Sequence, residues 1–347
     1  MNTVINTVTG AVSIDSLTTV LPHEHLLINL GNQYSGKKVY GVDGENDKVS
    51  LENLGLLRRD CYILRDNLLL DSTETATDEV LWFKRAGGGA IVDVTPCGVG
   101  RDVKALREIS LKTGVQIIAG TALYTHDAIP EYLEKMSVEE LADFFVSELC
   151  EGIEGTDIKA GVIGEIGTST EIYPVEERAL RAAALANLKT GAPILIHTYP
   201  WGKLGLKALD IIAEYGVDMR SVCICHVDVK FDVDYIKAIM DRGAWVEFDD
   251  FGKEFYIVTK PGEFAGGAFA SDVERVRMLD RLCRDGYADR ILASNDICLK
   301  MLLHKHGGFG YDHMLSNIRP MMECEGMCEE HISQIIDKNP IEFLKGR

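Results

Sequence analysis

Long apolar segments are absent from this sequence of 347 residues. No stretch approaches the roughly 20 uninterrupted apolar residues that a membrane-spanning helix needs, so we expect no membrane span. The first six residues lack the basic start and the apolar core of a targeting signal. Among the nine scattered cysteines there is no C-x-x-C pair. Scattered thiols in odd number suit a reducing compartment better than a disulfide framework, and we therefore expect a cytoplasmic protein.

Positive charge is scarce as well. The chain has 36 lysines and arginines against 54 aspartates and glutamates, which gives a formal net charge of -18. Nucleic-acid phosphates and anionic membrane surfaces repel such a chain, so we expect neither as a partner. Hydrophobic residues make up 46% of the chain and charged residues 26%, which is typical of a globular protein with a large core. No linker-like segment interrupts the sequence, and we expect a single domain over residues 1–347.

The chain does have a regular alternation of short apolar runs with longer amphipathic ones. Nearly continuous apolar runs are typical of parallel strands that are buried on both faces. We expect such strands over residues 20–30, 90–97, 115–124, 161–167, 193–199, 222–228, 244–250 and 290–296. Apolar residues recur at helical spacing over residues 75–86, 103–113, 138–153, 175–190, 204–215, 233–242, 272–286 and 330–344.

Local signals mark several helix ends. Gly114 and Gly191 each follow a predicted helix, where a residue at positive φ commonly ends it. Ser137, with Glu140 three residues later, has the pattern of a capping box at a helix start. We therefore expect helix boundaries at these positions.

Eight strands alternating with eight helices predict an α/β protein with a (β/α)8 barrel, the TIM-barrel fold. The alternative is a doubly wound open sheet, but the sequence lacks the glycine-rich turn that such folds place after the first strand. Two segments are additional to a bare barrel. Residues 32–47 are polar and are expected to form a loop over the site, and residues 253–267 are expected to form a lid after the seventh strand.

The first predicted strand contains a His-x-His motif, His23 and His25. Alternate residues of a strand share a face, so the two imidazoles project side by side and can reach one metal ion. For an isolated motif, a pair of core histidines bonded to the backbone is the equally ordinary alternative. The residues at the ends of the other strands favour the metal site.

Polar side chains stand where other predicted strands end, which is where the active site of a barrel forms. These residues are Glu165, His197, His226 and Asp296. With the His-x-His pair they provide four imidazoles and two carboxylates, all of them ligands for zinc-like ions. Unpaired buried charge is costly, so an entirely structural role for this set is disfavoured.

Six ligands exceed the needs of one tetrahedral ion and suit two divalent ions that share a bridge. Glu165 is the natural bridge, because a carboxylate has two oxygens. Asp296 could bind one ion weakly and accept the proton from a hydroxide held between the ions. Zinc is the expected metal, with manganese, cobalt and iron as alternatives.

These residues resemble the pattern of the phosphotriesterase-related branch of the amidohydrolase superfamily. The resemblance begins with Thr-Val-Leu-Pro-His-Glu-His at residues 19–25 and continues with Val-Asp-Val-Thr at residues 92–95 and Gly-Arg-Asp at residues 100–102. It then follows the family's order through Glu165, His197, His226 and Asp296 and so spans essentially the whole chain.

The resemblance implies a (β/α)8 barrel with a binuclear metal centre. His23 and His25 would bind the more buried ion together with Asp296. His197 and His226 would bind the more exposed ion.

The bridging position departs from the founding phosphotriesterases, which have a carboxylated lysine where this chain has Glu165. Because a glutamate bridge also occurs within the branch, the metal centre is still implied. The departure weakens the inference that this chain hydrolyses organophosphate triesters as the founding members do. Other members of the branch are lactonases, sugar-phosphate lactonases, carboxylesterases and an N-acetyl-amino-sulfonate amidase.

We therefore expect a metal-dependent hydrolase in which the bridging hydroxide attacks the carbonyl of a carboxylic ester, lactone or amide, with Asp296 as the proton acceptor. Its partner would be a small-molecule substrate, and a homodimer is possible for a barrel of this class. One alternative is phosphodiester or phosphotriester hydrolysis at the same metal centre. Another is a metal-loaded barrel that only binds a ligand.

Three residues near the predicted centre are candidates for substrate binding. Tyr124 and His126 follow the third strand, and Lys253 lies in the expected lid. Lys253 could recognise a phosphate, sulfonate or carboxylate, with a solvated surface position as the alternative. Trp201 could form the floor of a leaving-group pocket or pack against a neighbouring loop.

Other polar residues are expected to have structural roles. Alternation along the strand before His226 directs Cys223 and Cys225 towards the helices, as packing residues. Arg101 and Asp102 favour a structural salt bridge over a substrate clamp. Three later histidines match no metal motif and are expected to shape the pocket or an oligomer contact: His304, His306 and His313.

Overall fold

The computed structural model describes residues 3–257 and 267–346 of the chain. An eight-stranded sheet lies at its centre, with the strand order β14-β11-β10-β9-β8-β7-β6-β3 and parallel pairing throughout. The strands are β3 (Val20–Glu24), β6 (Ala90–Asp93), β7 (Gln116–Thr121), β8 (Val162–Gly167), β9 (Ile194–His197), β10 (Val222–Ile224), β11 (Trp245–Phe248) and β14 (Ile291–Ala293). Each falls within a predicted strand.

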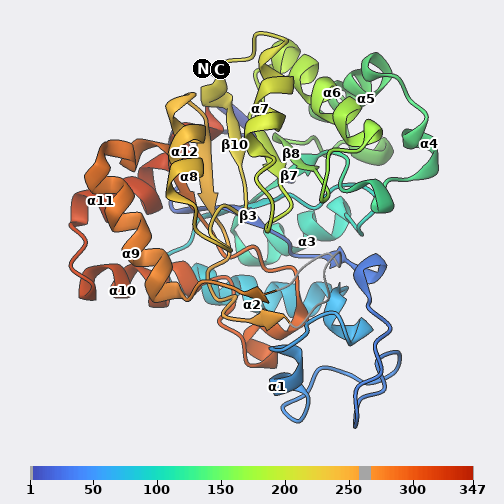
Figure 1. The fold of residues 1–347 in the computed structure, drawn as a ribbon. Coiled ribbons are helices and arrows are strands. Elements are labelled where there is room, and N and C mark those ends of the chain that lie inside the picture. Colours follow the sequence, from blue (N-terminus) through green and yellow to red (C-terminus); the bar gives the residue numbers. More distant parts are fainter. Residues whose placement is uncertain (1–2, 258–266, 347) are drawn as a thin grey trace.

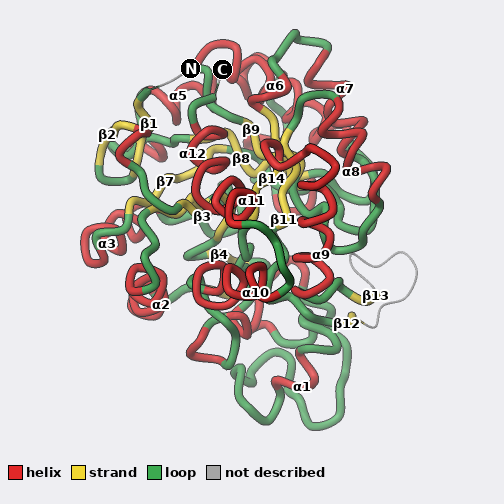
Figure 2. The backbone as a smooth tube through the Cα atoms, turned by 90° about the vertical axis from the view of Figure 1, so that its left-hand side faces the viewer, coloured by secondary structure: helices red, strands yellow, loops and turns green. Residues whose placement is uncertain are grey.

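Contacts between the first and last strands bring the ends of this sheet together. The backbone N–H of Asp296 donates to the carbonyl oxygen of His23 over 3.3 Å. The hydroxyl of Ser294 lies 2.8 Å from the same oxygen and accepts the backbone N–H of His23 over 3.3 Å. Figure 2 shows the strands at the centre with the helices around them. The predicted barrel is confirmed, and the open-sheet alternative is wrong.

Helices cover the outside of the barrel (Figure 1). The longer ones are α2 (Thr73–Arg85), α3 (Val103–Thr113), α5 (Val138–Cys150), α6 (Pro174–Thr190), α7 (Gly205–Ala213), α8 (Val233–Asp241) and α9 (Asp272–Leu282). The shorter ones are α1 (Leu54–Leu57), α4 (Glu131–Glu134), α10 (Arg319–Cys324), α11 (Glu329–Ser333) and α12 (Asn339–Leu344). The single helix predicted over residues 330–344 is divided by a π turn, Gln334–Lys338, before Pro340, which has no N–H to continue a helical ladder.

The predicted helix ends are confirmed. The hydroxyl of Ser137 accepts the N–H of Glu140 over 3.2 Å, and the Glu140 carboxylate accepts the N–H of Ser137 over 2.8 Å. Gly114 and Gly191 end α3 and α6 with φ values of 70° and 72°. A residue with a Cβ is disfavoured in this left-handed conformation, which explains glycine at both positions.

The first strand is shorter than predicted. It leaves the barrel after Glu24, and the backbone N–H of Leu26 donates to the Asp93 carboxylate over 2.8 Å. The apolar residues that follow form β4 (Ile28–Asn29), which pairs antiparallel with β5 (Leu69–Leu70). The apolar run over residues 20–30 is continuous in the sequence, but in the structure it is divided between the barrel sheet and the pair of strands β4 and β5.

The core has two layers. One lies between the strands and the helices, and the other fills the barrel interior with one or more residues from each strand, such as Val92, Leu195 and Leu292. Cys223 and Cys225 belong to the interior layer, so the prediction that they face the helices is wrong. His226 has a φ of 59°, and this left-handed residue breaks the strand alternation on which the prediction depended.

The remaining segments lie outside the barrel. β1 (Val4–Thr7) pairs antiparallel with β2 (Gly10–Ser13), and β12 (Tyr256–Ile257) with β13 (Gly267–Ala268). The predicted loop at residues 32–47 extends from the barrel beside α1 (Figure 1). Most of the predicted lid, residues 258–266, is outside the described residues. Among the helices that the structure describes, none has the length and apolar composition required to cross a membrane.

Candidate metal centre

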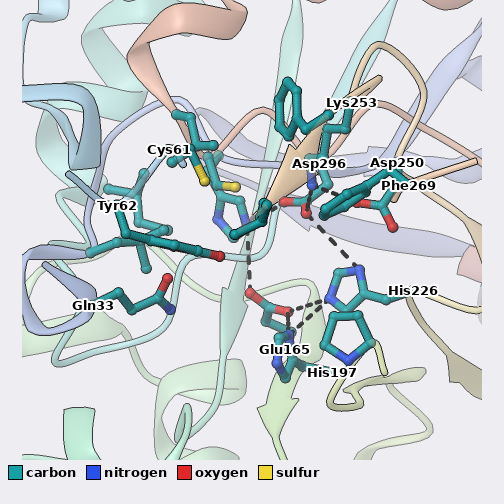
Figure 3. Close-up of a pocket in the computed structure, with 18 of the residues that line it drawn as sticks. Gln33, Cys61, Tyr62, Glu165, His197, His226, Asp250, Lys253, Phe269 and Asp296 are labelled. Atoms are coloured by element: carbon teal, nitrogen blue, oxygen red, sulfur yellow. Dashed lines mark hydrogen bonds and ion pairs between the residues drawn. The ribbon is translucent and has the colours of Figure 1, made fainter. Parts of the chain in front are cut away.

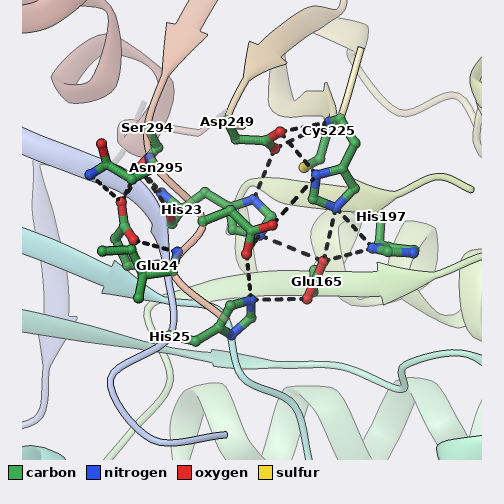
Figure 4. A network of polar contacts seen from close by, with 12 residues as sticks. His23, Glu24, His25, Glu165, His197, Cys225, Asp249, Ser294 and Asn295 are labelled. Atoms are coloured by element: carbon green, nitrogen blue, oxygen red, sulfur yellow. Dashed lines mark hydrogen bonds and ion pairs between the residues drawn. The ribbon is translucent and has the colours of Figure 1, made fainter. Parts of the chain in front are cut away.

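The six predicted metal ligands come together at the carboxyl ends of the barrel strands (Figure 4). None of them exposes more than 6% of its surface. They come from strands that are far apart in the chain: His23 and His25 from β3 and its end, Glu165 from β8, His197 from β9, His226 from the end of β10 and Asp296 from the end of β14. The barrel therefore brings all six side chains into one buried cluster.

Glu165 lies at the centre of the cluster. Its carboxylate oxygens lie 3.6 Å from Nε2 of His23, 3.4 Å from Nε2 of His25, 3.2 Å from Nδ1 of His197 and 3.6 Å from Nε2 of His226. Burial alone would raise the pKa of Glu165, but hydrogen bonds from the surrounding imidazoles hold it well below the usual range. The central carboxylate is thus ionised.

Asp296 approaches the same imidazoles from the other side of the barrel. Its Oδ1 lies 3.1 Å from Nε2 of His25 and 3.8 Å from Nε2 of His23. Like His226, Asp296 has a backbone conformation in the left-handed region, with a φ of 45°. Residues other than glycine rarely adopt it, and such conformations often occur at functional sites.

The donor atoms fit divalent cations. Nitrogen and oxygen ligands bound at about 2.0–2.2 Å around a tetrahedral ion lie roughly 3.3–3.6 Å from one another, close to the separations around Glu165. Twelve buried side-chain nitrogen or oxygen atoms of the described residues lack a hydrogen-bond partner, and three of them belong to this cluster: His23 Nε2, Glu165 Oε2 and His197 Nε2. Among the described residues five groups have ligand spacing, and three of them consist only of the predicted ligands: His23 with His25 and Glu165, His23 with His226 and Asp296, and Glu165 with His197 and His226.

Two carboxylates that sequence reasoning missed orient the histidines. Glu247 Oε2 lies 3.1 Å from Nδ1 of His23, and Asp249 Oδ1 lies 2.9 Å from Nδ1 of His226. Because Nδ1 is engaged in each case, Nε2 faces the centre. Burial raises the pKa of Asp249 to about 6, although the adjacent His226 opposes this. The signal in the sequence was a pair of carboxylates two residues apart in an otherwise apolar strand, since buried charge needs a partner.

A cavity opens beside the cluster (Figure 3). Its lining is largely apolar, with Ile28, Leu30, Trp201, Phe255 and Phe269 among the side chains. Polar groups at one end and an apolar wall are typical of a small-molecule site. Trp201, which the sequence placed either in the pocket or against a loop, lines this cavity.

Two of the three candidates for substrate binding line the cavity. Tyr124 is buried, and its hydroxyl lies 3.4 Å from Nδ1 of His197. Lys253 is buried too, so its alternative interpretation as a solvated surface residue is wrong. Its ammonium lies 2.8 Å from Asp250 Oδ1 and also pairs with Asp296 Oδ2 (Figure 3). Among the described residues that line the cavity, Lys253 is the only lysine or arginine.

The ion pairs of Lys253 set the ionisation of its neighbours. Burial would lower the pKa of Lys253, but Asp250 and Asp296 hold it well above its usual value. Burial would likewise raise the pKa of Asp296, and the Lys253 ammonium together with His25 and His23 instead lowers it. Asp296 is therefore an ionised carboxylate at the cavity wall.

His126 lies outside the cavity lining. Its ring stacks on Tyr173 with 3.9 Å between the ring centroids, and its Nδ1 lies 3.0 Å from the hydroxyl of Ser169. These contacts fix a turn after β7 and do not bring the imidazole to the metal ligands. Nothing in the sequence pattern distinguished His126 from Tyr124, since both follow the same strand.

The other polar residues have structural partners. Arg101 donates to both oxygens of Glu148 over 2.8 and 2.6 Å, while Asp102 caps the start of α3. Arg101 thus forms a structural salt bridge, as predicted, but its partner is Glu148 and not Asp102. Of the later histidines, His304 contacts Asp312 at 2.5 Å and His313 contacts Asp272 at 2.9 Å. None of the candidate metal groups in the described part of the chain contains His304, His306 or His313.

Comparisons with known proteins identify relatives over almost the whole chain. Residues 3–344 match the sequence model of the Phosphotriesterase family. The N-acetyltaurine hydrolase of Tetraodon nigroviridis is 35% identical over 342 residues, which cover 98% of this chain and 97% of that protein.

Solved structures have the same fold. A resiniferatoxin-binding protein from Rhodobacter sphaeroides superposes with a TM-score of 0.93 at 34% identity, covering 99% of this chain and 95% of that one. The lactonase Lmo2620 from Listeria monocytogenes superposes with a TM-score of 0.79 at 24% identity, covering 99% of both chains. At that identity, the second likeness concerns the fold alone.

Proposed function

The chain belongs to the phosphotriesterase family, and from this premise we propose that it is a hydrolase that uses two divalent metal ions to cleave a carboxylic amide, ester or lactone. The observation that carries the proposal is the cluster of four imidazoles and two carboxylates, centred on Glu165, at the polar end of a largely apolar cavity. An amide is favoured over the other two bonds, because a full-length relative at 35% identity is named N-acetyltaurine hydrolase.

Each ligand has a proposed place. His23, His25 and Asp296 would hold one ion, His197 and His226 the other, and Glu165 would bridge them. When bound, the ions would polarise the scissile carbonyl and lower the pKa of the attacking water. Zinc is the proposed metal, because imidazole and carboxylate together are typical zinc ligands.

Asp296 is proposed to accept the proton of the attacking water. Its Oδ1 faces His25 and His23, and its Oδ2 pairs with the Lys253 ammonium. Because its pKa is low, Asp296 is ionised before each turnover. The departing amine or alcohol would take this proton as the carbon–nitrogen or carbon–oxygen bond breaks.

The cavity suggests which part of a substrate would lie where. The Tyr124 hydroxyl, 3.4 Å from His197, is placed to donate to the substrate carbonyl. Lys253 is placed to attract an anionic group such as a carboxylate or sulfonate, and the apolar wall would pack against the connecting methylenes. The proposed substrate is therefore an N-acyl amide that carries an anionic group.

The test is metal content per chain combined with hydrolysis rates on a substrate panel. The panel contains N-acetyltaurine, an N-acetyl amino acid, an aryl carboxylic ester, a γ-lactone, a sugar-lactone phosphate and a phosphotriester. Two ions per chain and a clear preference for an N-acetyl amide support the proposal. A preference for the phosphotriester contradicts it, and so does inactivity on every substrate after zinc or manganese is added.

An Asp296→Asn variant separates catalysis from simple ligand binding. Loss of a proton acceptor lowers kcat by roughly 100- to 10,000-fold, and the variant is assayed at zinc concentrations that keep both proposed sites loaded. A metal-loaded protein whose residual turnover is unchanged by this substitution would favour a barrel that only binds its ligand.

A further inference from the structure

Glu24, the residue between the two histidines of the His-x-His motif, has no place among the proposed metal ligands. It is fully buried, and its carboxylate faces the segment that follows β14 (Figure 4). Strand alternation explains this direction, because His23 and His25 share one face of β3 and Glu24 has the other. A fully buried carboxylate needs hydrogen-bond donors around it.

The donors to Glu24 all come from residues 294–297. Its Oε1 accepts the backbone N–H of Asn295 over 2.9 Å and the side-chain amide of Asn295 over 2.9 Å. Its Oε2 accepts the backbone N–H of Ile297 over 2.9 Å. The hydroxyl of Ser294 lies 2.8 Å from Oε1 as well. One side chain of β3 thus gathers four polar groups from a segment about 270 residues later in the chain.

Asp296 lies between the two backbone groups that Glu24 binds. The N–H groups on either side of it belong to Asn295 and Ile297, and its own N–H donates to the carbonyl oxygen of His23 over 3.3 Å. Three consecutive backbone amides are therefore attached to β3. This attachment is relevant because Asp296 has a φ of 45°, a conformation that is uncommon for residues other than glycine and is held here by the three bonds.

We propose that Glu24 is a positioning residue: it holds residues 295–297 in the conformation that directs the Asp296 carboxylate at the imidazoles of His23 and His25. The inference depends on the role proposed above for Asp296. In the structure the two carboxylate oxygens of Glu24 face all of these donors. Glutamine would place an amide N–H against one of the backbone N–H groups, and aspartate is one methylene too short.

A buried glutamate elsewhere in the chain provides a matched control. Glu79 of α2 is 3% exposed, and its carboxylate accepts the backbone N–H groups of His304 and Lys305, each over 3.0 Å. Glu79 is not among the residues that line the cavity. Glu24→Gln and Glu79→Gln therefore make the same chemical change at two buried carboxylates that bind backbone amides.

The experiment compares these two variants in the full-length, zinc-reconstituted protein. It measures the unfolding temperature, kcat and KM on the best substrate of the panel, and zinc affinity by competition with a chelator. We expect both variants to lose thermal stability. Only Glu24→Gln should also lose roughly 10- to 100-fold in kcat with little change in KM, together with weaker binding of one zinc ion. The same kcat and zinc affinity in both variants would overturn the proposal.

A second variant keeps the test decisive if Glu24→Gln does not fold. Asn295→Ala removes one side-chain partner of Glu24 and leaves its carboxylate and the backbone amides in place. We expect a smaller loss of kcat and zinc affinity in the same direction, and unchanged values would overturn the proposal. Asp296→Asn is measured in parallel. If it keeps full turnover, the proposed role of Asp296 fails, while zinc affinity still reports whether Glu24 positions that residue.

Discussion

Glu247 and His23 form a fully buried contact of 3.1 Å between a carboxylate oxygen and Nδ1. The two residues lie 224 positions apart in the chain, on β11 and β3. Glu247 also accepts the thiol of Cys225 over 3.2 Å. β11 contributes none of the proposed metal ligands, yet through Glu247 and Asp249 it orients one histidine of each proposed ion site.

The contact between Glu247 and His23 predicts an effect on metal affinity. Glu247→Ala frees the imidazole to rotate and removes the negative charge that strengthens it as a ligand, so we expect roughly 10- to 100-fold weaker binding of one zinc ion. Chelator competition measures this. Glu176→Gln is the control, because Glu176 is equally buried and accepts backbone amides of His126 and Ser169 away from the cluster. Equal zinc affinity in the two variants would contradict the prediction.

Lys253 predicts the charge preference of the enzyme. Lys253→Met removes the ammonium from the cavity wall, and a lost charge-assisted hydrogen bond of about 1.5–3 kcal/mol corresponds to a rise of roughly 10- to 100-fold in KM for N-acetyltaurine. A neutral aryl ester should show a smaller change in KM. Lys253→Arg, which keeps the positive charge, is the control. If KM rises equally for charged and neutral substrates, Lys253 does not recognise the anion.

Metal removal should weaken the fold as well as activity. Without ions, the cluster places buried carboxylates and orphaned imidazole nitrogens together. A ligand that binds only the folded chain adds about 2.7 kcal/mol of stability at 100 times its Kd, so chelation should lower the unfolding temperature and zinc should restore it. Calorimetry of the chelated and reconstituted protein measures this. An unfolding temperature that is independent of zinc would argue against a resident metal.

Asp272 predicts a pH dependence of stability that is separate from the metal centre. Its carboxylate lies 2.9 Å from Nε2 of His313 and 3.1 Å from the Arg275 guanidinium. Burial would raise the pKa of Asp272, but the hydrogen bond of His313 leads the contacts that lower it. Because this pKa is lower in the folded than in the unfolded chain, the contribution to stability is fully present above the ordinary value of about 3.9 and is lost as the pH falls.

Urea unfolding of Asp272→Asn should therefore depend on pH. We expect a loss of roughly 1–3 kcal/mol at pH 7, relative to the unsubstituted chain, that shrinks below about pH 4. Asp285→Asn is the control, because Asp285 pairs with Lys237 at the surface and should have little effect at either pH. A loss from Asp272→Asn that is the same at both pH values would show that its charge is not the stabilising property.

Much of the barrel could be predicted because its signals are local. Each strand is a short apolar run, and the helix ends at Ser137, Gly114 and Gly191 depend on residues within a few positions of one another. The six proposed ligands could be predicted for a related reason. A histidine or carboxylate at the end of an apolar strand is conspicuous in sequence, and a parallel barrel places all such ends at one face.

The residues that position these ligands could be identified only from the tertiary structure. Glu24 binds residues about 270 positions away, and Glu247 binds His23 across 224 positions, so neither pairing has a local signal. The burial of Lys253 likewise follows only from the packing of Asp250 and Asp296 around it. Local spacing indicates which strand face a side chain occupies only where the strand stays regular, and the partners of that side chain are determined only when the barrel closes and brings distant strands together.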